Sequence, residues 1–68
     1  MPGKSDQEII QAGYEASVGQ VYAIFFESMA STQSEGTQRQ AEESFIRGVK
    51  LARQVRDRAL QLLEVGNR

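Results

Sequence analysis

Two strings of small and apolar residues, spaced three and four positions apart, run through the two halves of this 68-residue chain. Steps of this size keep all members of a string on one face of a helix, so each half is predicted to be helical. If the chain folds back on itself, the strings face each other in pairs whose position numbers all sum to 71. The first string is Ile9, Ala12, Ala16, Gly19, Ala23, Phe26 and Ala30, and the second is Ala41, Phe45, Gly48, Ala52, Val55, Ala59 and Leu62. This shared register predicts an antiparallel hairpin that is packed closely along the two strings.

Capping signals predict where the two helices begin and end. The sequence SDQE at residues 5–8 fits a capping box, which predicts a first helix over about residues 6–31. The polar cluster at residues 31–36 marks the loop of the hairpin. A second capping box from Thr37 to Gln40 predicts a second helix over about residues 37–65, with Gly66 and Asn67 as its C-terminal cap. The expected fold class is therefore all-α, with residues 1–68 forming a single helical-hairpin domain.

The side of the first helix opposite its small-residue string is apolar as well. Turned away from the second helix, it would present Ile10, Tyr14, Val18, Val21 and Phe25 to water. Soluble monomers rarely expose a contiguous apolar stripe of that length. These five residues are therefore predicted to form an interface, either with a second copy of the chain or with a different protein.

Length and composition favour the second copy. A chain this short buries a small core, and small domains commonly recover stability from disulfides, a metal ion or self-association. The chain has no cysteine for disulfides and no histidine, the commonest ligand of zinc or copper. We therefore predict a homodimer in which the first helix packs against its twin, so that two hairpins form a four-helix bundle.

The residue types that support catalysis or cofactor binding are scarce. Without histidine and cysteine, a general base would have to be Asp, Glu, Lys or Tyr. Glu15 and Glu27 lie 12 residues apart, which is about 18 Å along one helix. No Glu-x-x-His pair is present to build a di-metal site, and the glycines do not form a phosphate-binding loop. We predict no enzymatic activity, no metal ion and no cofactor.

Charge is divided unevenly along the chain, although the net charge is only −1. Residues 1–36 carry one lysine against five acidic residues, and residues 37–68 carry seven basic residues against four acidic ones. Attraction between an acidic and a basic helix explains this division. A basic outer face of the second helix that binds nucleic acid is the alternative, and its residues would be Arg47, Lys50, Arg53 and Arg58.

No part of the chain reads as a membrane or export signal. The most apolar run, residues 18–26, is far shorter than the roughly 20 residues of a membrane span. An acidic segment, with no basic region, precedes the first apolar stretch. We expect a soluble cytoplasmic protein without membrane contact. The function that these features favour is a non-catalytic protein–protein interaction module, a small regulator or adaptor. A nucleic-acid-binding regulator is the alternative.

Overall fold

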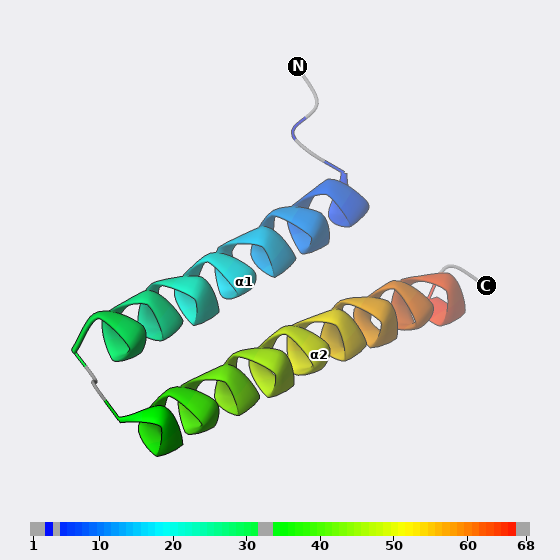
Figure 1. Cartoon of the computed structure of the whole chain (residues 1–68). Helices are drawn as coiled ribbons and strands as arrows, with labels where there is room; N and C mark the ends of the chain where they lie inside the picture. The colour runs from blue at the N-terminus through cyan, green and yellow to red at the C-terminus, as the bar shows by residue number, and fades with distance from the viewer. Residues whose placement is uncertain (1–2, 4, 32–33, 67–68) are drawn as a thin grey trace.

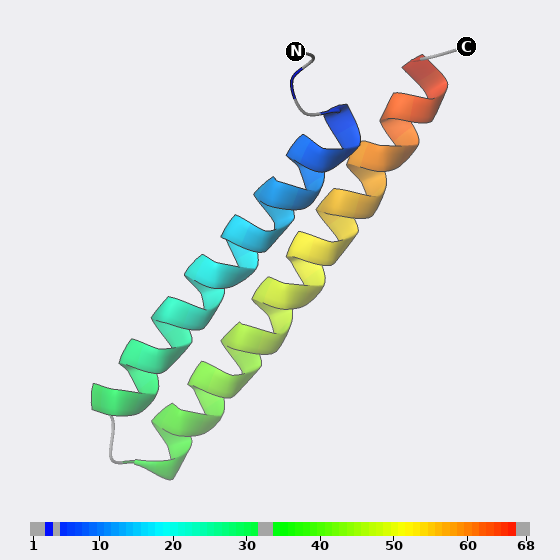
Figure 2. The ribbon, with the colours of Figure 1, turned by 90° about the horizontal axis from the view of Figure 1, so that it is seen from above.

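The computed structural model describes residues 3, 5–31 and 34–66, and this part of the chain contains two α-helices. Helix α1 spans Asp6–Ser31 and helix α2 spans Glu35–Gly66. The helices lie side by side and antiparallel, so that the start of α1 and the end of α2 are at the same end of the molecule (Figure 1 and Figure 2). The predicted all-α hairpin is confirmed, and both ends of α1 agree with the prediction.

Serine hydroxyl groups begin both helices. At α1 the Oγ of Ser5 accepts a hydrogen bond of 3.2 Å from the backbone N–H of Glu8, as the first capping box predicts. At α2 the cap is Ser34, whose Oγ accepts from the backbone N–H groups of Gly36 at 3.2 Å and Thr37 at 3.5 Å. The prediction that Thr37 begins this helix is wrong, because Ser34 satisfies the first free N–H groups one turn earlier. The predicted C-terminal cap is wrong for Gly66, which is the last residue of α2 and does not adopt a positive φ, and its other residue, Asn67, lies outside the described residues.

The prediction of which side of α1 faces α2 is wrong. All seven members of the first small-residue string are exposed, and Ile9 and Phe26 keep 56% and 60% of their accessible surface. The half-buried residues of α1 lie on its other side, and they are Ile10, Tyr14, Val18, Val21, Phe25, Ser28 and Met29. These larger side chains remove more apolar surface from water than alanine and glycine would, which favours this side of the helix.

The second string is confirmed for most of its length. Ala41, Phe45, Gly48, Ala52 and Ala59 are half-buried on the side of α2 that faces α1. Val55 and Leu62 depart from the prediction, because they remain 59% and 54% exposed.

Three contacts hold the helices together and fix their register. A Cβ atom built on Gly48 would lie 2.9 Å from both Cγ atoms of Val21, so the side chain of Val21 packs directly over this glycine. On the loop side of this contact, the rings of Phe25 and Phe45 lie 4.8 Å apart between centroids. On the other side, the guanidinium carbon of Arg56 lies 4.4 Å from the centroid of the Tyr14 ring, within the range of a cation–π interaction. The position numbers of these pairs sum to 69 or 70, close to the predicted 71.

The hairpin is one layer of helices and encloses no core. Its Cα atoms extend over 52 × 26 × 7 Å, with a radius of gyration of 16.0 Å. A compact domain of this length would have a radius of gyration of about 11 Å. None of the described residues is buried, and those between the helices are half-buried at most. Two broad faces of the layer therefore remain open to solvent.

Candidate functional site

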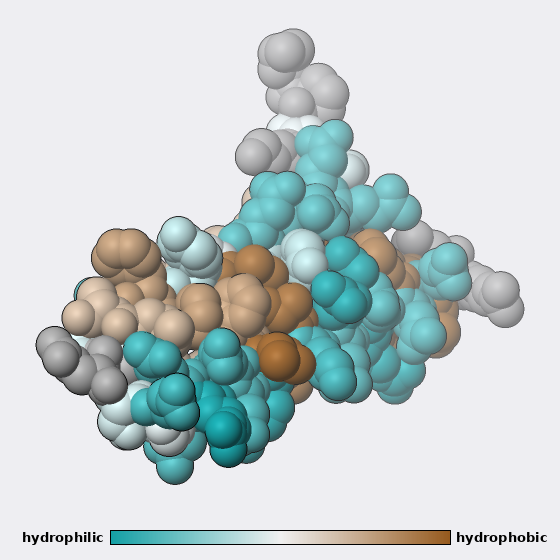
Figure 3. Space-filling model, in the orientation of Figure 1, coloured by the Kyte–Doolittle hydropathy of each residue, from teal (hydrophilic) through white to brown (hydrophobic). Residues whose placement is uncertain are grey.

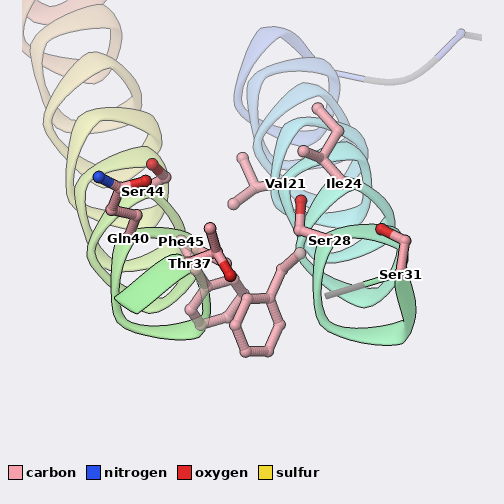
Figure 4. Close-up of a pocket in the computed structure, with 10 residues that line it drawn as sticks. Val21, Ile24, Ser28, Ser31, Thr37, Gln40, Ser44 and Phe45 are labelled. Atoms are coloured by element: carbon pink, nitrogen blue, oxygen red, sulfur yellow. The ribbon is translucent and has the colours of Figure 1, made fainter. Parts of the chain in front are cut away.

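A groove runs along one of the two broad faces of the hairpin, between α1 and α2. It consists of two hollows, with volumes of about 540 and 520 Å³, which meet at Val21. We call these two hollows together the long groove. Figure 4 shows the hollow nearer the loop, where Val21 points into the space between the helices and Gln40 and Ser44 line the α2 side. The other hollow continues past Gly48 to Ala59.

The long groove is almost free of charge. Its lining is mainly apolar beside Gly48, whereas serine and glutamine side chains such as Ser28, Gln40 and Ser44 contribute to it near the loop. Among the described residues that line it, Arg56 is the only charged one, and it lies at the end remote from the loop. Three large apolar residues of the lining stay mostly accessible: Ile24 at 65%, Leu51 at 60% and Val55 at 59%. Because its lining is so exposed, the long groove is an open channel of the kind that accommodates a helix.

The other broad face has a different character. Figure 3 shows it with hydrophilic side chains over most of α2 and apolar side chains gathered over the C-terminal half of α1. Helical spacing assigns residues of α2 to the two faces. Ile46 follows Phe45 and Leu51 precedes Ala52, and both Phe45 and Ala52 face α1. Each residue of a helix is rotated by 100° about the helix axis relative to the one before it. Ile46 is therefore rotated forward from the direction of α1 and Leu51 backward from it, which places the two residues on opposite broad faces.

A third hollow, of about 530 Å³, lies where α1 begins and α2 ends. It is lined by both polar and apolar residues, including Asp6, Ile10, Arg56, Leu63 and Glu64. From its position in the sequence, Arg56 is expected to pack its stem within the apolar arc and reach Gln20 or a carboxylate of a partner chain. Its guanidinium instead lies over the Tyr14 ring and forms an ion pair of 3.1 Å with Asp57 of the same helix. This arginine joins the two helices of one hairpin.

The five residues predicted as an interface lie between the two helices of the hairpin. Val21 packs over Gly48, and the Phe25 ring packs against Phe45 at an interplanar angle of 37°. Tyr14 lies beneath Arg56, and Ile10 and Val18 are half-buried. The accessible parts of Ile10, Tyr14, Val21 and Phe25 line the long groove. Their contribution to an interface with a second chain stays a prediction.

The basic residues predicted for nucleic-acid binding are all exposed but do not form a single patch. Arg47 and Lys50 point away from α1. Helical spacing turns Arg53 toward the broad face that carries Ile46, and Arg58, which precedes Ala59, toward the broad face that carries Leu51. Acidic Glu43 and Asp57 stand on the same outer side of α2. The guanidinium of Arg58 donates to the side-chain oxygen of Gln61 at 3.4 Å. Positive charge is thus spread over about 140° of the helix and interrupted by carboxylates.

Sequence reasoning missed Leu51 and assigned Val55 to the contact between the helices. Both residues line the long groove, and both are mostly exposed. The signal that could have found them is their spacing, because Leu51, Val55 and Leu62 recur at steps of four and seven on the flank of α2 beside the half-buried string.

Within residues 3, 5–31 and 34–66, no helix combines the length and the hydropathy needed to cross a bilayer. No group of three acidic, histidine or cysteine side chains in the same residues lies close enough together to hold a metal ion. Comparison of the chain with models of protein families, with curated proteins and with solved structures found no match.

Proposed function

We propose that this chain is a non-catalytic protein–protein interaction module, a small regulator or adaptor that works as a homodimer of two helical hairpins in a four-helix bundle. The observation that carries the proposal is that none of the described residues is buried. A single layer of two helices leaves too little apolar surface covered to offset the conformational entropy that folding removes. Packing a second layer onto the first supplies the missing burial.

The accessible surface area supports a dimer of obligate type. The chain exposes 5695 Å². A compact monomer of its mass, 7.6 kDa, would expose about 4,300 Å². The excess is about 1,400 Å² per chain, so two chains that each covered it would bury about 2,800 Å² in total. Obligate dimers bury about 2,000 to 5,000 Å².

The composition of the chain supports the non-catalytic part of the proposal. Without histidine and cysteine, its acid–base groups are carboxylates, lysines and tyrosines. Tyr14 is half-buried and packs against Arg56, which is a structural role. The accessible surface of the described residues consists mainly of the faces of two helices, and such faces commonly form protein–protein interfaces.

Urea unfolding followed by circular dichroism over about a hundredfold range of protein concentration tests the proposal. If folding requires association, the midpoint rises with concentration, because mass action favours the dimer. A midpoint that stays constant, with a full helical signal at the lowest concentration, would show that the monomer folds by itself and would overturn the proposal.

Nucleic-acid binding by α2 is the competing hypothesis, and it predicts a different dependence on salt. Binding through phosphates weakens steeply as salt rises, whereas binding through apolar protein surfaces does so weakly. Fluorescence anisotropy with labelled RNA and DNA at low and high salt therefore separates the two. Salt-sensitive binding that disappears when Arg47, Lys50, Arg53 and Arg58 are all changed to alanine would favour the competing hypothesis.

A further inference from the structure

The long groove differs from the rest of the surface because both helices contribute to it and because its lining is almost uncharged. A chain that packs on it contacts Ile24 of α1 together with Leu51 and Val55 of α2. The exposed small-residue side of α1 offers only one helix, at the edge of the layer. The other broad face carries charged residues such as Arg53, which lose their hydration when they are covered. Covering the long groove therefore removes apolar surface of both helices from water, and Arg56 is the one charged residue among the described residues that line it.

A second copy of the chain fits this face by shape. Each hairpin is a flat layer, only 7 Å thick at the level of its Cα atoms. Two such layers stacked face to face form a two-layer bundle in which all four helices line one core. With α1 of one copy over α2 of the other, every pair of neighbouring helices is antiparallel. The chain exposes about 1,400 Å² more than a compact monomer of its mass, and an area of this size is what each subunit of an obligate dimer buries.

The charges at the rims of the long groove also fit a second copy. On α1, Glu27 follows Ile24 by three positions and Gln20 by seven, so it lies beside the α1 rim. On α2, Arg58 follows Leu51 by seven positions and Arg47 precedes it by four, so both lie beside the α2 rim. When α1 of one copy covers α2 of the other, Glu27 of the α1 rim lies about one helical turn from the level of Arg47 on the α2 rim, and this pairing occurs on both sides.

We infer that a second copy of this chain packs on the long groove, so that Leu51 and Val55 lie in the core of the dimer while Ile46 stays at its surface. This inference rests on the homodimer proposed above and identifies the face that forms it. It differs from the predicted packing of α1 against its own twin, because the side of α1 expected to make that contact already packs on α2.

Single thiols test the inference directly, because the chain contains no cysteine. Leu51→Cys and Ile46→Cys form a matched pair on one helix, with wild-type side chains 60% and 51% exposed. The lone hairpin predicts that a thiol reagent reacts at position 51 as fast as at position 46, or faster. The inference predicts that, at concentrations where the dimer forms, position 51 reacts at least about 10-fold more slowly than position 46. The rate of each thiol in the native protein is divided by its rate in the urea-unfolded chain, which corrects for differences in intrinsic reactivity.

A pair of charge substitutions provides an independent measurement. In Leu51→Glu a carboxylate must enter the dimer core twice, once from each copy, so the dimer dissociation constant should rise by at least about 100-fold. Ile46→Glu should change it by less than about threefold, because position 46 stays in water. Light scattering coupled to size-exclusion chromatography gives the mass of each variant over a range of concentrations.

Each contrary result has a separate meaning. A dimer in which position 46 is protected, or in which both thiols react equally, would overturn the inference and leave the proposed dimer intact. Equal thiol rates in a wild-type chain whose urea midpoint does not depend on concentration would overturn the dimer itself. Where the Leu51→Glu variant is unfolded at low concentration, joint recovery of its helix content and its dimer mass at higher protein concentration would support the inference. The inference is contradicted if Leu51→Glu stays unfolded at every concentration and the thiol of Leu51→Cys also reacts without protection.

Discussion

Gly48 has a specific partner in the opposite helix. The two methyl groups of Val21 occupy the space above this glycine, and a Cβ atom there would lie 2.9 Å from both of them. Valine is branched at Cβ and stiff about χ1, so rotation of the side chain does not relieve the overlap. The register of the hairpin is fixed where a large residue of α1 fits a gap in α2. The 71-sum pattern paired Gly48 with Ala23 instead, a contact between two small residues that would bury less area.

Gly48→Ala should therefore destabilise the protein by about 1 kcal/mol, because overpacking of about 1–3 kcal/mol outweighs the helix propensity that alanine gains. Gly19→Ala is the matched control. Gly19 also lies inside a helix, but a Cβ atom at this position would have nothing within 4 Å, so alanine there should stabilise by up to about 1 kcal/mol. Urea unfolding at one fixed protein concentration measures both. In a Val21→Ala background, Gly48→Ala should become as favourable as Gly19→Ala, and failure of that rescue would contradict the contact.

At the scale of the helices, spacing predicted the element types and nearly all of the boundaries, but not which side of α1 packs. Both sides of α1 are apolar: one carries Ile9 and Phe26 among alanines, and the other carries Tyr14, Val21 and Phe25. Rotating α1 about its axis exchanges these sides and changes the register by only one or two positions. Register alone therefore could not distinguish them. The side with more area to bury is the one that packs.

The beginning of α2 is the second point at which local sequence was ambiguous. Ser34 and Thr37 are both good N-terminal caps, and the capping-box pattern selected Thr37. In the structure the hydroxyl of Ser34 accepts two backbone hydrogen bonds, while the hydroxyl of Thr37 donates to the Ser34 carbonyl oxygen at 3.0 Å. A pattern match does not show which of two competing caps leaves fewer N–H groups unsatisfied.

Ser34→Ala should consequently cost about 1 kcal/mol of stability, as the loss of an N-terminal cap does. Thr37→Ala should cost less, since Thr37 lies inside the first turn and its own N–H remains bonded. Thermal unfolding followed by circular dichroism ranks the two variants. Ser34→Asn, which preserves a capping side chain, should lie close to wild type. A larger loss from Thr37→Ala than from Ser34→Ala would restore Thr37 as the cap.

At the scale of the whole molecule, the hairpin is half of a packing unit. The residues that line the long groove could be predicted in part, because four of the five predicted interface residues border it. The contribution of Leu51 and Val55 to the long groove could not be predicted, because their exposure depends on how α1 is rotated about its axis. The sequence leaves that rotation open. Glu27 on the α1 rim and Arg47 on the α2 rim are opposite in charge, which favours packing of α1 of one copy on α2 of another.

The mass of the folded particle tests this account most directly. Sedimentation equilibrium at micromolar concentration, with circular dichroism on the same samples, should give a helical species of twice the 7.6 kDa of the chain. On dilution, helix content and mass should fall together, because the single layer has no enclosed core to keep it folded. A fully helical species with the mass of one chain would contradict the account.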